Sequence, residues 1–296
     1  MGGEQMLFQT FMNGIMNALV LILIASGLCL VFGIMRIVNF AHGEFYMLGG
    51  FGAWLLFAEK LLPNIGAPTF NYIAAIILSM VVVGILGVLV ERFLFRPFVG
   101  NMELTMIVSF GVMLILQAAS LVSFGVRDKS FGSPFSGNFH LGGISLSEER
   151  MAVVICGVIF MIAMYLFIQR TKLGKAMRAV AQDMEAASVQ GININICFSL
   201  AMGIACALAA LAGALMGPIF YVNPYMGVEP IMKAFVVVIL GGMGSLPGAV
   251  IGGFIVGMGE SFVTTYVGAH LAMMVVFMIM IGVFLLKPTG ILGHEE

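Results

Sequence analysis

The chain has 296 residues, of which 61% are hydrophobic and only 9% are charged. Soluble domains contain about 25% charged residues, so this composition excludes an ordinary soluble domain and indicates an all-α polytopic membrane protein. The formal net charge is -1, which gives no general positive field and therefore no reason to expect a nucleic-acid partner.

The apolar runs are long enough to cross a bilayer. Since a spanning helix needs roughly 20 mainly apolar residues, we expect about eight hydrophobic helical segments in one transmembrane domain over residues 1–296, some of them broken or re-entrant. They lie near residues 7–32, 45–58, 70–90, 104–124, 151–168, 194–219, 231–258 and 271–286. The second segment is short, and the first and seventh are long or interrupted.

Basic residues are unevenly divided between alternate connections. The richer set contains Arg36, Arg92, Arg96, Arg170, Lys172, Lys175 and Arg178, and the poorer set contains Lys60, Arg127, Lys129 and Arg150. The positive-inside rule therefore places the N-terminus outside and the loop 169–193 in the cytoplasm. The connection 125–150 becomes the sizeable external loop. It is either an ordinary exposed loop or a docking surface for an extracytoplasmic partner.

Polar residues interrupt the apolar run 33–54. Asn39, His42 and Glu44 fall at membrane depth, where polar groups are costly and tend to face a cavity or one another. They either line a pathway or include a hydrogen-bonded histidine–glutamate pair that fastens a helix break. Gln117 lies mid-span in a later segment, where an interhelical hydrogen bond is more common than a contact with substrate.

A second break is indicated by the proline-rich stretch 217–230, which carries Asn223. The words NFAHG and NPYMG each follow an apolar span and precede a small-residue helix, which is a faint sign of two similar halves. Both breaks are expected to face a pathway. Lys233 falls near the outer boundary, where its side chain can snorkel, and Glu260 is expected at an interface.

The seventh segment, 231–258, contains GGMGSLPG at its middle. Pro247 lacks a backbone donor at a point where glycines already weaken the helix. Irregular backbone is tolerated at membrane depth when it is buried in protein or lines a cavity. We expect a broken or re-entrant pair of helices, with the tail that carries Lys287 in the cytoplasm rather than outside.

The loop 169–193 is expected to form one short helix on the membrane surface. No proline or glycine occurs from Lys175 to Gln190, and Gly191 stands where a left-handed cap would end the helix. Glu185, Ala186 and Ala187, followed by Gly191, resemble the EAA loop of ABC importer permeases. That resemblance implies a helix that enters a groove on an ATPase subunit, whereas the plainer alternative is a solvated connector.

Longer words extend the resemblance from about residue 14 to residue 292. GLCLVFGIMRIVNFAHGEFYMLG, ERFLFRP, RAVAQDMEAASVQGI, GPIFYVNPYMG and AFVVVILGGMGSLPGAVIGG look like the permease subunit of branched-chain amino acid ABC importers, the LivH type. The resemblance implies an ABC importer permease fold in a bacterial or archaeal inner membrane. It also implies a second homologous permease subunit, two cytoplasmic ATPase subunits and an extracytoplasmic substrate-binding protein.

The substrate remains open within this resemblance, because relatives that carry urea or short amides share it. The chain lacks G-x-x-x-x-G-K-[ST], and Ala176 follows Gly174-Lys175, so we expect no ATP hydrolysis, no catalytic residue, no metal and no cofactor. The predicted function is the permease of an ATP-driven importer of branched-chain, apolar amino acids. A secondary transporter is the alternative, although few carboxylates lie deep in the membrane.

Overall fold

The computed structural model describes residues 3–60, 67–135, 137–141, 144–287 and 289–293. The α-helices are α1 (Gly3–Met35), α2 (His42–Ala53), α3 (Pro68–Val90), α4 (Met102–Phe124), α5 (Glu148–Arg170), α6 (Lys172–Gln182), α7 (Met184–Val189), α8 (Ile194–Met216), α9 (Val228–Gly241), α10 (Leu246–Tyr266) and α11 (Ala269–Leu286). A π-helical turn, Trp54–Ala58, extends α2; another, Glu91–Phe95, extends α3 and leads into the 3-10 turn Arg96–Phe98. The strands β1 (Asn138–Leu141) and β2 (Ile144–Ser147) form an antiparallel hairpin.

Within these described ranges, seven helices are long and apolar enough to cross a membrane, namely α1, α3 with its extension to Phe98, α4, α5, α8, α10 and α11. The predicted all-α polytopic class is therefore confirmed. The short segment 45–58 is α2 with its π-helical turn, and the predicted segment 194–219 runs past the end of α8 at Met216.

The predicted break in segment 231–258 is also confirmed. Helix α9 ends at Gly241 and α10 begins at Leu246, with Gly242 and Gly244 at φ values of 101° and 83° in the turn between them. Ser245 caps α10 by accepting a hydrogen bond from Gly248 N at 3.2 Å. Pro247 falls in the first turn of α10, where a missing N–H costs nothing.

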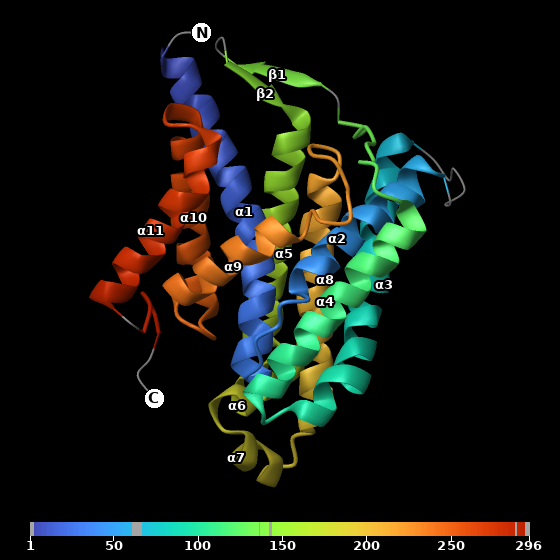
Figure 1. Cartoon of the computed structure of the whole chain (residues 1–296), viewed down its shortest axis with the longest axis vertical. Coiled ribbons are helices and arrows are strands. Elements are labelled where there is room, and N and C mark those ends of the chain that lie inside the picture. The colour runs from blue at the N-terminus through green and yellow to red at the C-terminus, as the bar shows by residue number, and fades with distance from the viewer. Residues whose placement is uncertain (1–2, 61–66, 136, 142–143, 288, 294–296) are drawn as a thin grey trace.

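Helix α1 lies at the centre of the bundle and packs against α5, α8, α9 and α10 (Figure 1). Its middle turns are buried on every side. Helix α2 packs on α8 almost backbone to backbone, since a Cβ at Gly49 would lie 2.3 Å from Ala210 Cα. A larger residue at Gly49 would separate these two helices.

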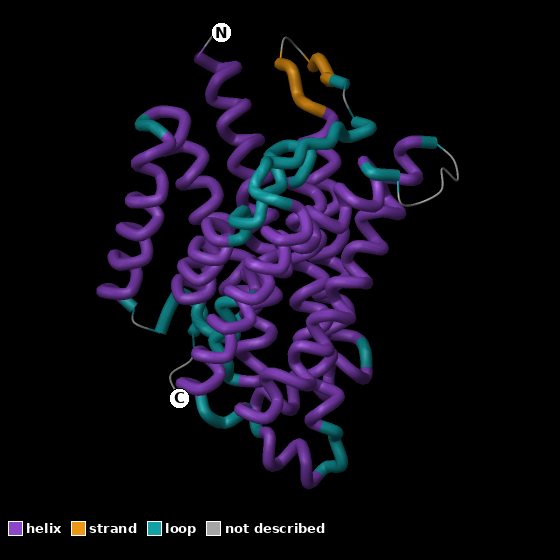
Figure 2. Tube along the Cα trace, turned by 45° about the vertical axis from the view of Figure 1, so that its right-hand side comes forward, coloured by secondary structure: helices purple, strands orange, loops and turns teal. Residues whose placement is uncertain are grey.

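The two ends of the molecule differ. The N-terminus and the β1–β2 hairpin lie at one end, whereas α6 and α7 lie at the other (Figures 1 and 2). The hairpin belongs to the predicted external loop 125–150, and the same loop is joined to the stretch 217–230 through paired backbone hydrogen bonds of 2.8 Å between Lys129 and Val222. The N-terminus and the loop 169–193 thus lie at opposite ends, as the distribution of basic residues predicts.

The last described residues return to the end of α9. Ile291 N donates to Leu240 O at 2.9 Å, and Leu292 N donates to Gly241 O at 3.0 Å. The C-terminal segment lies in the half of the molecule that holds α6 and α7 (Figure 2). It therefore closes the carbonyl end of the broken helix.

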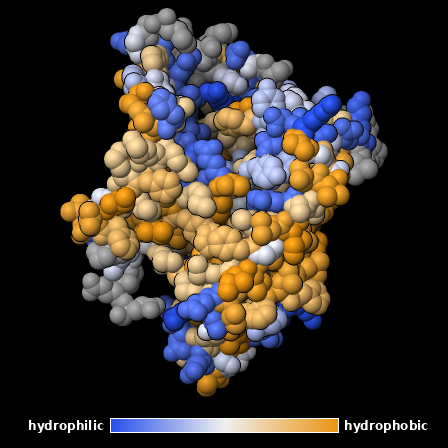
Figure 3. All heavy atoms as spheres, in the orientation of Figure 1, coloured by the Kyte–Doolittle hydropathy of each residue, from blue (hydrophilic) through white to orange (hydrophobic). Residues whose placement is uncertain are grey.

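A broad hydrophobic surface crosses the middle of the molecule (Figure 3). Large exposed apolar side chains occur on several of the spanning helices, including Val82 of α3, Ile107 and Ile115 of α4, Ile159 of α5 and Phe284 of α11. An exposed apolar area of this extent faces lipid or another membrane subunit.

Candidate functional site

The predicted surface helix over 175–190 is wrong in one respect, because two helices replace it. Asp183 leaves the helical region at φ −151° and ψ 111°, and its Oδ1 accepts a hydrogen bond from Ala186 N at 2.9 Å. An aspartate that caps a following helix interrupts the preceding one, since its side chain competes for the backbone donors. Helix α6 therefore ends at Gln182, and α7 begins anew at Met184.

The predicted cap at Gly191 is confirmed. Gly191 has φ 81°, and its N–H donates to Ser188 O at 2.9 Å just after α7. The next residue, Ile192, donates to Ala187 O at 3.1 Å. These bonds satisfy backbone carbonyls at the end of α7. The helix is therefore capped at both ends, by Asp183 at its start and by Gly191 at its end.

Helix α6 anchors this region on the bundle. Gly174, Met177 and Val180 are buried, and α6 contacts α1, α5 and α8. Thr171 caps α6 by accepting a hydrogen bond from Gly174 N at 3.0 Å. Basic residues occupy the exposed side of α6, so the helix has an apolar inner face and a positive outer face.

The four residues of the EAA-like pattern, in and just after α7, differ in their exposure to solvent. Glu185, Ala186 and Gly191 are exposed, whereas Ala187 is buried against the bundle. Val189 is 88% exposed at the tip. The exposed pattern residues Glu185, Ala186 and Gly191, together with the neighbouring exposed Val189, form what we call the α7 tip.

The polar residues of the first break are all buried but point to different helices. His42 Nε2 lies 3.1 Å from Ile24 O of α1, and Asn39 Nδ2 lies 3.8 Å from Met202 Sδ of α8. Glu44 Oε1 accepts a hydrogen bond of 2.8 Å from Gln117 Nε2 of α4. The alternative of a fastened histidine–glutamate pair is wrong, since each side chain ties the break to a separate helix.

Three atoms of this group keep unused hydrogen-bonding capacity. Among the described residues, Asn39 Oδ1, His42 Nδ1 and Glu44 Oε2 are buried without a hydrogen-bond partner. Buried polar atoms are nearly always paired with protein or ordered water, so these three atoms are exceptions among the described residues. Gln117 makes the interhelical hydrogen bond that its position predicts.

Asn223 plays a local part only. Its Oδ1 accepts a hydrogen bond from Tyr225 N at 3.0 Å, which shapes the turn before α9. The structure does not bring its side chain to Glu44 or His42. The backbone of its loop does reach the first break, because a Cβ at Gly43 would lie 2.5 Å from Gly227 O. The two similar words NFAHG and NPYMG thus meet through their glycines.

A cluster that we did not predict as a site lies on α9 and α10. Lys233 Nζ lies 2.5 Å from Glu229 Oε1 and 2.6 Å from Glu260 Oε1. The lysine does not snorkel as expected, because its side chain is only 10% exposed. The four-residue spacing of Glu229 and Lys233 on one helix was the available signal, since such residues face each other.

This cluster faces a cavity of about 490 Å³. Helices α1, α9, α10 and α11 supply most of its wall, with Tyr46 from α2 and Arg150 from the first turn of α5. In Figure 3 the upper part of the visible face is hollowed and bordered by hydrophilic residues. Asn13 and Arg150 hydrogen-bond each other on the wall.

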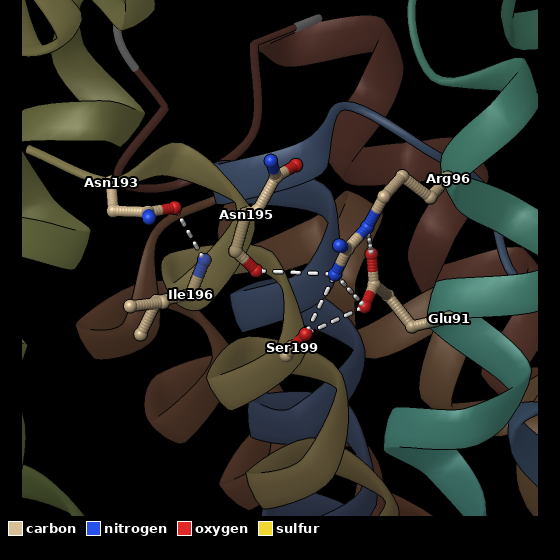
Figure 4. A network of polar contacts seen from close by, with 6 residues as sticks. All are labelled: Glu91, Arg96, Asn193, Asn195, Ile196 and Ser199. Carbon is tan, nitrogen blue, oxygen red and sulfur yellow. Dashed lines mark hydrogen bonds and ion pairs between the residues drawn. The ribbon is translucent and has the colours of Figure 1, made fainter.

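A second unpredicted network joins α3 to α8 (Figure 4). Fully buried Glu91 accepts hydrogen bonds from Arg96 Nε at 2.8 Å and Nη2 at 2.7 Å. Ser199 of α8 donates to Glu91 Oε2 at 2.8 Å, and Arg96 also reaches Asn195 O at 3.3 Å. The bidentate pair holds the π-helical end of α3 against the first turns of α8.

Comparison of the sequence with known proteins identifies the family of this chain. The family described as "Branched-chain amino acid transport system / permease component" matches residues 10–284. The "High-affinity branched-chain amino acid transport system permease protein LivH" of Salmonella typhimurium is 36% identical and covers 99% of this chain and 98% of that protein. The corresponding protein BraD of Pseudomonas aeruginosa is 34% identical, covering 97% of this chain and 96% of that protein.

More distant similarity reaches permeases of another kind. The "Fructose import permease protein FrcC" of Rhizobium meliloti is 28% identical, over 58% of this chain and 49% of that protein. The full-length matches and the spanning helices together establish a multi-pass membrane permease. The chain belongs to the family of branched-chain amino acid transport system permease components.

Proposed function

We propose that this chain is the transmembrane permease subunit of an ATP-driven importer of branched-chain amino acids. Residues 1–296 form one permease domain, with a cytoplasmic coupling loop over 169–193 and an external loop over 125–150. A second, homologous permease subunit completes the translocation pathway. Two cytoplasmic ATPase subunits supply the energy, and an extracytoplasmic binding protein delivers the substrate.

The α7 tip is the observation that carries this proposal. It presents an exposed valine, an alanine and a glutamate at the end opposite the N-terminus. We take the exposed valine and alanine, beside the charge of Glu185, as the surface that enters a groove on an ATPase subunit. The basic outer face of α6 beside it is typical of the cytoplasmic side.

Movement of the tip can reach the membrane core because α6 is anchored. Its buried Met177 and Val180 pack on the bundle, and α6 contacts both α1 and α8. Helix α1 in turn packs on α9 and α10, which border the cavity. A displacement of α6 by the ATPase would therefore shift the helices that border the pathway.

The direct test is uptake by proteoliposomes that contain the chain, its copurifying subunits and the binding protein. Leucine uptake that requires ATP supports the proposal. Urea uptake alone would keep the importer and change its substrate. Uptake of leucine by the isolated chain, driven by an ion gradient without ATP, would instead establish a secondary transporter.

A pair of matched variants tests the role of the tip. Val189→Asp places a charge where we expect an apolar groove contact, so ATPase subunits should copurify at a fraction of the usual amount. Val126→Asp is the control, because Val126 is 73% exposed in the external loop. Normal ATPase association of the Val189→Asp protein would rule out the docking role of the tip.

A further inference from the structure

The cavity beside Lys233 has both an apolar part and a charged part. Its apolar part includes four methionines, namely Met16, Met216, Met226 and Met273, beside residues such as Val20, Leu21 and Phe220. Its polar part contains the cluster of Glu229, Lys233 and Glu260 together with the side chains of Tyr46 and Thr264. A volume of about 490 Å³ falls within the ~300–1,000 Å³ of pockets that hold small molecules.

The charges of the cluster do not balance. Lys233 is 8% exposed, and its neutralisation needs one carboxylate, which Glu260 supplies with a side chain only 16% exposed. Glu229 is the second carboxylate, and its side chain is 68% exposed. The cluster therefore carries one negative charge more than the buried lysine requires, and the excess carboxylate is accessible from the cavity.

The hydrogen-bonding groups also leave room for a ligand. An ammonium group has three N–H donors, and the two glutamates occupy two of those of Lys233. One donor remains for an anionic group. A ligand with a carboxylate and an ammonium on adjacent atoms could take the third donor of Lys233 and approach Glu229 at the same time.

We propose that this cavity binds the zwitterionic head of an amino acid, with Lys233 holding its carboxylate, Glu229 holding its ammonium and the methionines covering its apolar side chain. The inference rests on the proposed function and deepens it, because it names the groups that recognise the substrate inside the membrane. Methionine suits this task, since its flexible and polarisable side chain adapts to differently branched partners.

The position of the cavity fits delivery from outside. Its wall contains Arg150, in the first turn of α5 directly after the β1–β2 hairpin, and Asn13 of α1, which is hydrogen-bonded to Arg150. Tyr46 and Lys233 lie further along α2 and α9 on the same wall. A substrate released at that end would meet the charged cluster before it reached the buried polar atoms of the first break.

Both charges matter for selectivity. A leucine molecule offers a carboxylate and an ammonium, whereas urea and short amides offer neither. Charged hydrogen bonds are about twice as strong as neutral ones, so the cluster favours a zwitterion over an uncharged polar solute of similar size. Leucinol lacks the carboxylate and 4-methylpentanoate lacks the ammonium, which makes these two compounds suitable probes of each half.

The test is protection of an introduced cysteine in the purified complex. Thr264→Cys is a small change on the cavity wall, and its labelling by a water-soluble thiol reagent should slow in leucine. The rate should fall about tenfold at a leucine concentration ~10 times its Kd, following simple competition. Leucinol, 4-methylpentanoate and urea should protect weakly at that concentration.

Charge variants complete the experiment. Glu229→Gln is isosteric and largely exposed, so it should fold, and it should shift half-protection of Thr264→Cys to a leucine concentration roughly tenfold higher or more. Glu4→Gln, an exposed glutamate of α1 outside the cavity, should leave protection unchanged. Equal protection by urea, or no leucine protection in the Thr264→Cys protein, would overturn the inference.

Uptake measurements separate this inference from the proposed function. If the wild-type complex imports leucine with ATP while Thr264→Cys is labelled equally with and without leucine, the function stands and the site is wrong. If leucine protects but is not imported, the site stands and the proposed function fails.

Discussion

Gly43 and Gly227 cross so closely that a Cβ on Gly227 would lie 2.1 Å from Gly43 O. Gly43 belongs to the first turn of α2 and Gly227 immediately precedes α9, so the starts of two short helices meet at this point. No side chain fits between them. The crossing fixes the two breaks relative to each other.

Gly227→Ala should therefore destabilise the fold. Inserting a methyl group between two backbones forces them apart, and overpacking of this kind costs about 1–3 kcal/mol. The melting temperature in detergent should fall. Gly111→Ala in α4 is the control, because its Cβ would meet no atom within 4 Å. An unchanged melting temperature for Gly227→Ala would contradict the crossing.

The cap of α7 gives a second prediction. Asp183→Ala removes the acceptor of Ala186 N and should weaken α7 by about 1 kcal/mol. The protein should insert normally but bind ATPase subunits less tightly, because the α7 tip would fray. Asp183→Asn retains a capping oxygen and should bind them nearly as wild type, so equal loss in both variants would argue for a charge effect instead.

The ion pair of Glu91 and Arg96 gives a third prediction. Arg96→Met leaves a fully buried carboxylate without its cation, and breaking such a pair costs about 3–5 kcal/mol. The double variant Glu91→Gln with Arg96→Met should recover part of the lost thermal stability. If the loss of stability in the double variant equals the sum of the losses in Glu91→Gln and Arg96→Met, the two residues are not coupled.

The hydrogen bond between Gln117 and Glu44 gives a fourth prediction. Gln117→Leu removes the donor to Glu44 and leaves its buried carboxyl group without a described partner, which costs about 1–3 kcal/mol. Substrate uptake should fall together with stability. Ser120→Ala, one turn away on α4, is the comparison, since no hydrogen bond of its side chain joins it to Glu44. Full uptake by Gln117→Leu would place this group outside the pathway.

Helix existence was predictable because long apolar runs leave the backbone no other way to pair its polar groups in a bilayer. The break at Gly242 was predictable too, since glycines and Pro247 stand together there. The cap at Asp183 was not recognised, although an aspartate three residues before Ala186 has the usual capping spacing. Local sequence patterns therefore predicted which helices exist better than they predicted the residues at which those helices begin and end.

The contacts of the site were less accessible to prediction. Asn39 lies between α1 and α2, and His42 and Glu44 lie in the first turn of α2, but their partners come from α1, α8 and α4. The cluster at Lys233 depends on Glu260, which lies in another helix. Such pairings depend on how helices pack, and the pattern of one segment contains no information about which residue of another segment faces it.

The hydrogen bonds from Ile291 and Leu292 to the end of α9 have a consequence for biosynthesis. A membrane chain is made from its N-terminus, so the carbonyls of Leu240 and Gly241 are synthesised some 50 residues before their donors. Until Ile291 and Leu292 have left the ribosome, the carbonyl groups at the end of α9, the helix that carries Lys233, lack these two donors. The cavity beside Lys233 can therefore reach its final form only after residues 291 and 292 have been synthesised.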